Sequence, residues 1–212
     1  MVKVVSFDLD STLIDGTFDR MLWDDAIPSL YAKENNVSLD EAKMRVFSEY
    51  YIAEHQEKNH EWASISYWMK RLGISGRIDT SEIEESIYVY EDVNETLSKL
   101  KKKYRLILST LNSKETLEIK MKASGLSGYF EKMYCDDNIS GKSISKIDEK
   151  LFSHIIEEEK VSPSEILHVG DNMITDVRIP STLGIRCILI DRAGKRKGDD
   201  VIHSLGELKN LL

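Results

Sequence analysis

Short apolar runs rich in β-branched residues alternate with segments of helical period along most of the chain. The runs occupy residues 2–7, 105–109, 166–169 and 186–190. Each has the length of a strand that is buried on both faces of a sheet. Apolar positions at a spacing of three to four residues predict helices over 92–103, 113–124 and 148–160. Strands alternating with helices form parallel βαβ units, so we predict an α/β fold: a Rossmann-like three-layer α/β sandwich with a parallel sheet.

Residues 18–87 interrupt this alternation. They contain no convincing strand, and their pattern predicts several amphipathic helices in succession. One is expected over 19–35, and the next begins at Ser38, whose hydroxyl can cap a helix while Glu41 reaches back. A third helix carries Trp62 and Trp68 and ends before Gly73, and a shorter one starts near Thr80. We therefore predict an all-helical cap domain, residues 18–87, inserted into a catalytic α/β core of residues 1–17 and 88–212.

Charge and apolar runs exclude several classes of partner. The 212 residues carry a formal charge of −8, which leaves no cationic surface to neutralise a nucleic-acid backbone. No apolar run approaches the roughly 18 to 20 residues that span a bilayer. The only two cysteines, Cys135 and Cys187, lack the spacing of a disulfide framework or a zinc site. We predict a cytoplasmic protein with no nucleic-acid or membrane partner, either a monomer or a homodimer.

Two carboxylates, Asp8 and Asp10, come directly after the first predicted strand. Open α/β sheets bind ligands at the carboxyl ends of their strands. Residues i and i+2 of an extended segment point the same way, so both acids can face one site if a cation offsets their repulsion. Because Asp also commonly ends strands and begins turns, the pair by itself does not decide between a site and a turn.

The strand at 166–169 also leads into carboxylates, Asp171 and Asp176, after Gly170. We expect Gly170 to let the backbone pass close to a ligand. Together with Asp8, these acids form an oxygen-rich set, which suits Mg²⁺, whereas zinc favours His or Cys. His168, which precedes the glycine, is expected to be a core residue.

A phosphate group also requires hydroxyl donors and positive charge. Ser109 and Thr110 both lie at the end of the second strand, and either hydroxyl could serve. Lys142 and Lys146 lie in the loop before the helix predicted over 148–160, and either could supply the charge. The residues themselves leave both choices open.

Taken together, these residues resemble the four motifs of the haloacid dehalogenase superfamily of aspartate-nucleophile phosphatases. Residues 8–12 are similar to its first motif, Thr110 to its second, a loop lysine to its third, and 170–176 to its fourth. The helical insert stands where this family places its first type of cap. Ser11 departs from the pattern, because glycine is common at that position.

Family spacing selects between the alternatives. In relatives the motif hydroxyl precedes the Phe of a Tyr-Phe pair by 20 residues, which here is Phe130 and selects Thr110. The family lysine precedes an aromatic residue by six positions and the acid of the fourth motif by 25. Both counts, to Phe152 and to Asp171, select Lys146.

The resemblance implies that Asp8 attacks phosphorus and forms an aspartyl-phosphate, which divides one difficult displacement into two steps. Asp10 would protonate the leaving alkoxide and later take a proton from the attacking water. Halide displacement needs no such acid, and dehalogenating relatives usually lack it, so the resemblance favours a phosphatase. We predict a phosphomonoester hydrolase. A phosphomutase or phosphotransferase with the same motifs, and a non-catalytic binding module, are the alternatives.

The resemblance also implies that Asp8, the backbone carbonyl of Asp10 and Asp171 hold Mg²⁺, while Asp176 steadies the metal shell and Lys146.

Thr110 and Lys146 would bind the phosphate oxygens. Eight basic and fourteen acidic residues over 18–88 give this insert a charge of −6. A closing cap with this charge favours a small metabolite that carries one phosphate over a polyphosphate or a nucleic-acid end.

Overall fold

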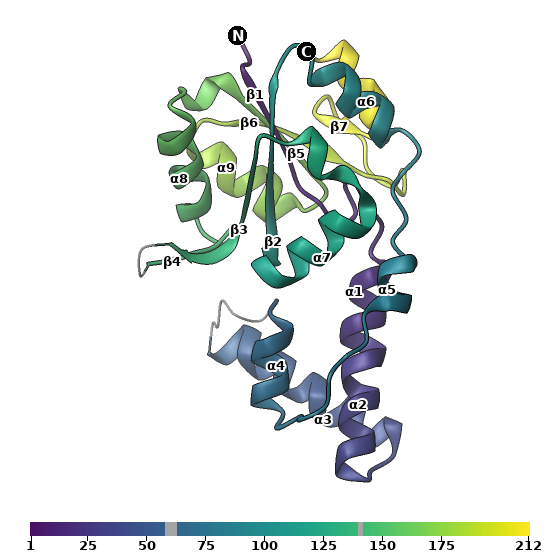
Figure 1. Ribbon diagram of the computed structural model, residues 1–212. Helices are drawn as coiled ribbons and strands as arrows, with labels where there is room; N and C mark the ends of the chain where they lie inside the picture. Colours follow the sequence, from purple (N-terminus) through teal and green to yellow (C-terminus); the bar gives the residue numbers. More distant parts are fainter. Residues whose placement is uncertain (58–62, 140–141) are drawn as a thin grey trace. The chain divides into compact units, whose positions relative to one another are not determined.

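The computed structural model describes residues 1–57, 63–139 and 142–212 (Figure 1). Trp62 of the third predicted helix lies outside these ranges. The chain forms two compact units. The sheet unit comprises Met1–Asp15, Tyr88–Leu111 and Ser124–Leu212, and the helical unit comprises Gly16–Ile87 and Asn112–Ala123. Within the described ranges, no helix is both long and apolar enough to cross a membrane.

A seven-stranded sheet, in the order β4-β3-β2-β1-β5-β6-β7, organises the sheet unit (Figure 1). β1 (Val4–Phe7) lies between β2 (Arg105–Ser113) and β5 (Ile166–Gly170) and pairs in parallel with both. β6 (Arg186–Ile190) and β7 (Val201–Ile202) continue the parallel pairing. On the other side, β3 (Lys132–Ile139) neighbours β2, and β4 (Lys142–Ile144) pairs with β3 in the antiparallel direction. The predicted α/β class is confirmed.

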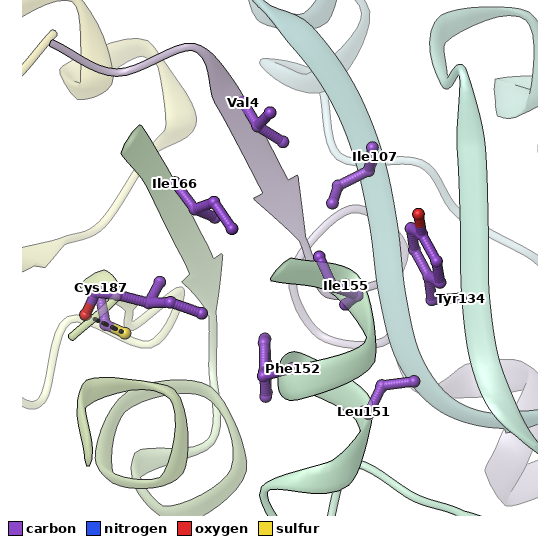
Figure 2. Packing of buried hydrophobic residues seen from close by; sticks show 9 residues of the cluster. Val4, Ile107, Tyr134, Leu151, Phe152, Ile155, Ile166 and Cys187 are labelled. Atoms are coloured by element: carbon purple, nitrogen blue, oxygen red, sulfur yellow. Dashed lines mark hydrogen bonds between the residues drawn. The ribbon is translucent and has the colours of Figure 1, made fainter. Parts of the chain in front are cut away.

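One face of the sheet is covered by α8 (Lys150–Glu159) and α9 (Ile179–Thr182). Figure 2 shows how side chains of the strands meet those of α8 in this core. The buried cluster consists of Val4, Ile107, Tyr134, Leu151, Phe152, Ile155, Ile166, Ile185 and Cys187. These residues are apolar at the strand positions and on one stripe of α8, which is the pattern from which the helix was predicted.

Strand residues of the opposite parity are buried as well, among them Val5, Leu106, Leu167 and Ile188. α6 (Val93–Leu100) lies on the side of the sheet opposite α8 (Figure 1) and buries a stripe of its own. Helices on both faces make the predicted three-layer arrangement. A strand covered on both faces has no polar face, which is why the sequence shows continuous apolar runs rather than alternation.

The helical unit begins with a continuous helical stretch built from α1 (Thr17–Asp19), the wider π-type turns of η1 (Arg20–Ala26) and α2 (Ile27–Asn35). α3 (Leu39–Tyr51) follows and continues into η2 (Ile52–Gln56). The Ser38 hydroxyl accepts the Glu41 N–H at 3.2 Å, as the sequence predicts. The Glu41 carboxylate, which was expected to reach back, instead pairs with Arg45 at 2.6 Å.

Two shorter helices complete this unit. α4 (Ile65–Arg71) ends just before Gly73, whose φ of 66° lies in the left-handed region that stops helices. α5 (Ser81–Glu85) follows Thr80. The core of the unit consists of Phe18, Leu22, Ile27, Val46, Ala53, Ile65, Trp68, Ile74 and Ile83. Its apolar stripes therefore pack against one another inside one bundle.

α7 (Lys114–Ser124) belongs to the helical unit through all of its residues but the last. Lys120 of this helix is fully buried and donates to Asp19 Oδ1 and Asn112 Oδ1, both at 2.8 Å. The carboxylate of Glu115 accepts the N–H of Ser66 at 3.1 Å. Such bonds explain why α7 groups with the insert. The functional division into a catalytic core and a cap stays a prediction.

Candidate active site

The first strand ends at Phe7, and the segment after it folds into a tight turn. The Leu9 carbonyl accepts the N–H groups of Leu13 and Ile14, at 2.8 and 3.1 Å. Ser11 has φ 57°, in the left-handed region. This explains why a glycine would suit its position, since a side chain is strained there. The turn leaves Asp8 nearly buried and Asp10 partly exposed at the end of β1.

The segment after β5 returns Asp176 to the strand end. The Asn172 side chain caps η5 (Met173–Arg178) by accepting the N–H groups of Ile174 and Thr175. The Asn172 N–H in turn donates to Asp176 Oδ2 at 2.8 Å. A Cβ at Gly170 would lie 2.3 Å from Asp176 Cγ. Gly170 therefore makes room for this carboxylate, and the expected close approach of its backbone to a ligand stays a prediction.

Lys146 lies between two of the predicted carboxylates. Its ammonium is 2.6 Å from Asp8 Oδ1 and also pairs with Asp176 Oδ1. Both Lys146 and Asp176 are 1% exposed. Asp8, Asp171 and Asp176 each offer an oxygen, and these atoms lie within 4.8 Å of one another. The structure thus brings together four of the six predicted site residues, from three separate segments.

Burial and crowding perturb the pKa values of these acids. Burial raises the pKa of Asp8 well above its ordinary value against the opposing pull of Lys146, and Asp176 and Asp10 add to the rise. Burial, with the charge of Asp176 beside it, also raises the pKa of Asp171, to about 6. For Asp176 burial is outweighed by Lys146 and by a hydrogen bond to His168, so its pKa lies below the usual range. Groups with shifted pKa values in one cluster are typical of functional sites.

Asp136, on β3, is a residue of this site that the sequence analysis missed. It is buried, and it accepts the Ser145 hydroxyl at 2.6 Å and the backbone N–H of Lys146 at 3.0 Å. These bonds fix the loop from which the Lys146 side chain reaches the acids. A carboxylate ten residues before the lysine was the available signal, but nothing in the sequence pointed to a strand there. The side chain of Lys142, the alternative lysine, falls outside the described part of the structure.

Thr110 and Asp10 are the two remaining predicted site residues. Thr110 is 2% exposed and lies within β2, which runs on to Ser113 instead of ending at Ser109. The competing hydroxyl of Ser109 lies in the interior, 2.8 Å from that of Ser6. Asp10 is close enough for its charge to raise the pKa of Asp8 and of Asp171. The roles of all six residues stay predictions.

The donor set suits a divalent cation. The three clustered acids offer only hard carboxylate oxygens, the ligands that Mg²⁺ and Ca²⁺ prefer. Burial, together with their mutual repulsion, raises the pKa values of Asp8 and Asp171, and a bound cation would offset this electrostatic cost. The residues present therefore fit a divalent metal. The carboxylate of Asp10 is not part of this group of three.

A family model described as haloacid dehalogenase-like hydrolase matches residues 2–179. The chain belongs to this family. The match spans both the segment 8–12 and the segment 170–176, and it confirms the expected membership and hydrolase class.

Characterised relatives and a solved structure are similar over most of their lengths. This hydrolase is 24% identical to the GMP/IMP nucleotidase YrfG of Escherichia coli (strain K12) over 173 residues, covering 81% of the chain and 75% of the relative. It is also 24% identical to the N-acylneuraminate-9-phosphatase of Rattus norvegicus over 220 residues, or 91% and 84%. A crystal structure of a HAD phosphatase from Thermococcus onnurineus superposes with a TM-score of 0.83 at 27% identity, covering 99% and 97%.

Proposed function

We propose that this hydrolase is a Mg²⁺-dependent phosphomonoester hydrolase that acts on a small phosphorylated metabolite. One observation supports the proposal. The buried ammonium of Lys146 pairs with both Asp8 and Asp176, and oxygens of Asp8, Asp171 and Asp176 lie close enough together to bind one cation. A nucleophilic carboxylate with a positive charge beside it is what attack on a phosphate dianion requires.

The chain's own groups supply each step. Asp8 attacks phosphorus, the bond to the ester oxygen breaks, and an aspartyl-phosphate forms. Lys146 faces the developing negative charge on the phosphoryl oxygens, and Thr110 donates a hydrogen bond to one of them. Asp10 gives its proton to the leaving alkoxide and then takes one from the water that hydrolyses the intermediate. Inorganic phosphate leaves, and Asp8 is regenerated.

Asp8, Asp171 and Asp176, with the backbone carbonyl of Asp10, would hold the metal. When bound, Mg²⁺ supplies positive charge that neutralises the phosphate oxygens. A carboxylate such as Asp8, whose pKa is raised by burial and by its acidic neighbours, is ionised more readily once a cation is present. Metal binding and formation of the nucleophile are therefore linked.

The relatives support the substrate class. One is named for hydrolysis of GMP and IMP and the other for hydrolysis of a sugar-acid phosphate, and both names describe small phosphomonoesters. The charge of −8 is a further argument against a polyanionic substrate. A dehalogenase is disfavoured because Asp10 serves no purpose in halide displacement. A monomeric or homodimeric state and a cytoplasmic location stay predictions.

The test is a panel of phosphate esters assayed with purified protein and Mg²⁺. It contains nucleoside monophosphates, sugar phosphates, a phosphopeptide and a 5′-phosphorylated oligonucleotide. We expect release of inorganic phosphate from the small esters, loss of this release with Asp8→Asn, and loss with excess EDTA. The exposed-site variant Asp199→Asn, which removes one charge from the surface, should match the wild type.

The panel also separates the alternatives. Turnover that requires an added sugar acceptor would replace the hydrolase with a phosphotransferase. Residual activity of Asp8→Asn above about 1% of wild type would exclude Asp8 as the covalent nucleophile. No turnover of any ester, together with a co-purifying protein, would favour the binding module.

A further inference from the structure

A chain of buried hydrogen bonds leads from the centre of the sheet to the carboxylate cluster. His168 Nε2 lies 3.0 Å from Asp176 Oδ1, and His168 Nδ1 lies 3.0 Å from the Ser6 hydroxyl. The Ser6 hydroxyl is 2.8 Å from that of Ser109. Ser6, Ser109 and His168 are fully buried and come from the three central strands β1, β2 and β5. Ser6 and His168 are direct partners in the pairing of β1 with β5.

The chemistry of these groups fixes the direction of the chain. An ionised carboxylate only accepts hydrogen bonds, so Nε2 of His168 must carry the proton that it shares with Asp176. Nδ1 of the neutral ring then accepts. The Ser6 hydroxyl at 3.0 Å and the Ser109 hydroxyl at 3.4 Å are both close enough to donate to it, and the two hydroxyls lie 2.8 Å apart. Donation therefore runs from this pair of serines to His168 and on to Asp176, and it selects one tautomer of the imidazole.

Both carboxylate oxygens of Asp176 accept hydrogen bonds. Oδ1 accepts from His168 and Lys146, whereas Oδ2 accepts from the backbone N–H of Asn172. The Lys146 ammonium is shared between Asp176 and Asp8, while His168 is fully buried within β5. His168 thus provides a neutral side-chain donor to Oδ1, opposite the backbone N–H that binds Oδ2.

We propose that His168 is a positioning residue that orients the Asp176 carboxylate for the metal and for Lys146. The inference rests on the proposed metal-dependent function. A neutral imidazole serves this purpose better than a lysine or an arginine, because it fixes the acid without cancelling the negative charge that attracts the cation.

Packing alone is the competing explanation. The His168 ring lies 5.0 Å from the Phe152 ring, edge to face, so its removal costs core contacts whatever its role. The two explanations differ on one point. A packing role depends on the volume of the side chain, whereas a positioning role depends on a donor at the Nε2 position.

Three variants separate the explanations. His168→Gln places an amide nitrogen near the former Nε2, His168→Asn places one near Nδ1, and His168→Met fills space with no donor. The readout is the dissociation constant of Mn²⁺ for the full chain without substrate, measured by electron paramagnetic resonance of the free ion. We expect Gln to remain within about threefold of wild type, and Asn and Met to bind roughly 10- to 100-fold more weakly.

The concentration of Mg²⁺ at half-maximal activity should rise in the same order, while the KM for substrate at saturating Mg²⁺ changes little. Equal Mn²⁺ binding by wild type, Gln, Asn and Met would overturn the proposal, as would a Gln variant that binds as weakly as Asn.

A measurement on the wild type keeps the inference testable if the variants do not fold. Two-bond ¹⁵N–¹H correlation spectra report which ring nitrogen of each of the five histidines carries a proton. Residue-selective assignment of His168 should show a neutral ring protonated at Nε2, and a ring protonated at Nδ1 would refute the proposal. If the wild type binds no Mn²⁺ and hydrolyses no ester, the proposed function fails. If it does both and the variants bind Mn²⁺ normally, only the role of His168 fails.

Discussion

Asp136 offers a test of the electrostatics that hold the lysine loop. Burial raises its pKa to about 7, even though the Ser145 hydroxyl and the Lys146 N–H both donate to it and pull in the opposite direction. In the unfolded chain the value is about 3.9. Between these values the folded protein holds a proton that the unfolded chain has lost.

Ionisation of Asp136 at higher pH destabilises the folded protein. Because the pKa is raised in the folded state, the stabilisation linked to this proton is fully present below about pH 4 and is lost as the pH rises to about 7. About three pH units at 1.36 kcal/mol each give roughly 4 kcal/mol. Asp136→Asn imitates the protonated acid, since its Oδ1 can accept the Lys146 N–H while the Ser145 hydroxyl turns to accept. The free energy of unfolding of the variant should therefore not show this decrease with rising pH.

The assay is urea unfolding of wild type and Asp136→Asn between pH 4.5 and 8. Other acids titrate in both proteins and cancel in the difference. Between pH 4.5 and 8 the free energy of unfolding of the variant should rise relative to that of the wild type by roughly 3 kcal/mol, and the variant should keep phosphatase activity. Asp199→Asn controls for the loss of one charge. A difference that stays flat within about 1 kcal/mol would refute the reasoning, because Asp136 would then ionise equally in both states.

Other substitutions test the remaining roles. Asp10→Asn should slow hydrolysis of an alkyl phosphate about 10²- to 10⁴-fold and of p-nitrophenyl phosphate less, because a good leaving group needs little acid; equal losses would exclude the acid role. Lys146→Met should lower the free energy of unfolding by about 3 to 5 kcal/mol in urea, because Asp8 and Asp176 lose their shared ammonium. If Lys142→Met abolished turnover and Lys146→Met did not, the chosen loop register would be wrong. Ser11→Val should be less stable than Ser11→Gly by about 1 kcal/mol or more, since φ 57° disfavours a β-branched side chain; equal melting temperatures would contradict this.

The sequence by itself determined the fold class and most of the helices and strands. Strands buried on both faces need continuous apolar runs, and such runs mark β1, β2, β5 and β6. The sequence predicted helix ends correctly where a local signal sets them, as at Ser38 and at Gly73. Signals of this kind act within a few residues, so a single chain can show them. β3, β4 and β7 were missed because a mixed polar strand and two very short ones carry no comparable pattern.

The sequence also named the acids of the site, because their positions at strand ends and their family spacing are both linear features. Only the tertiary structure decided how these groups are held. Asp136 and His168 form hydrogen bonds to residues 10 and 8 positions away, across strand and loop packing. Gly170 makes room for a carboxylate six residues later, which follows from how η5 folds back. Lys146 contacts Asp8, although the two residues are 138 positions apart in the sequence. The strength of such contacts depends on burial and distance, and neither is defined until the sheet has formed.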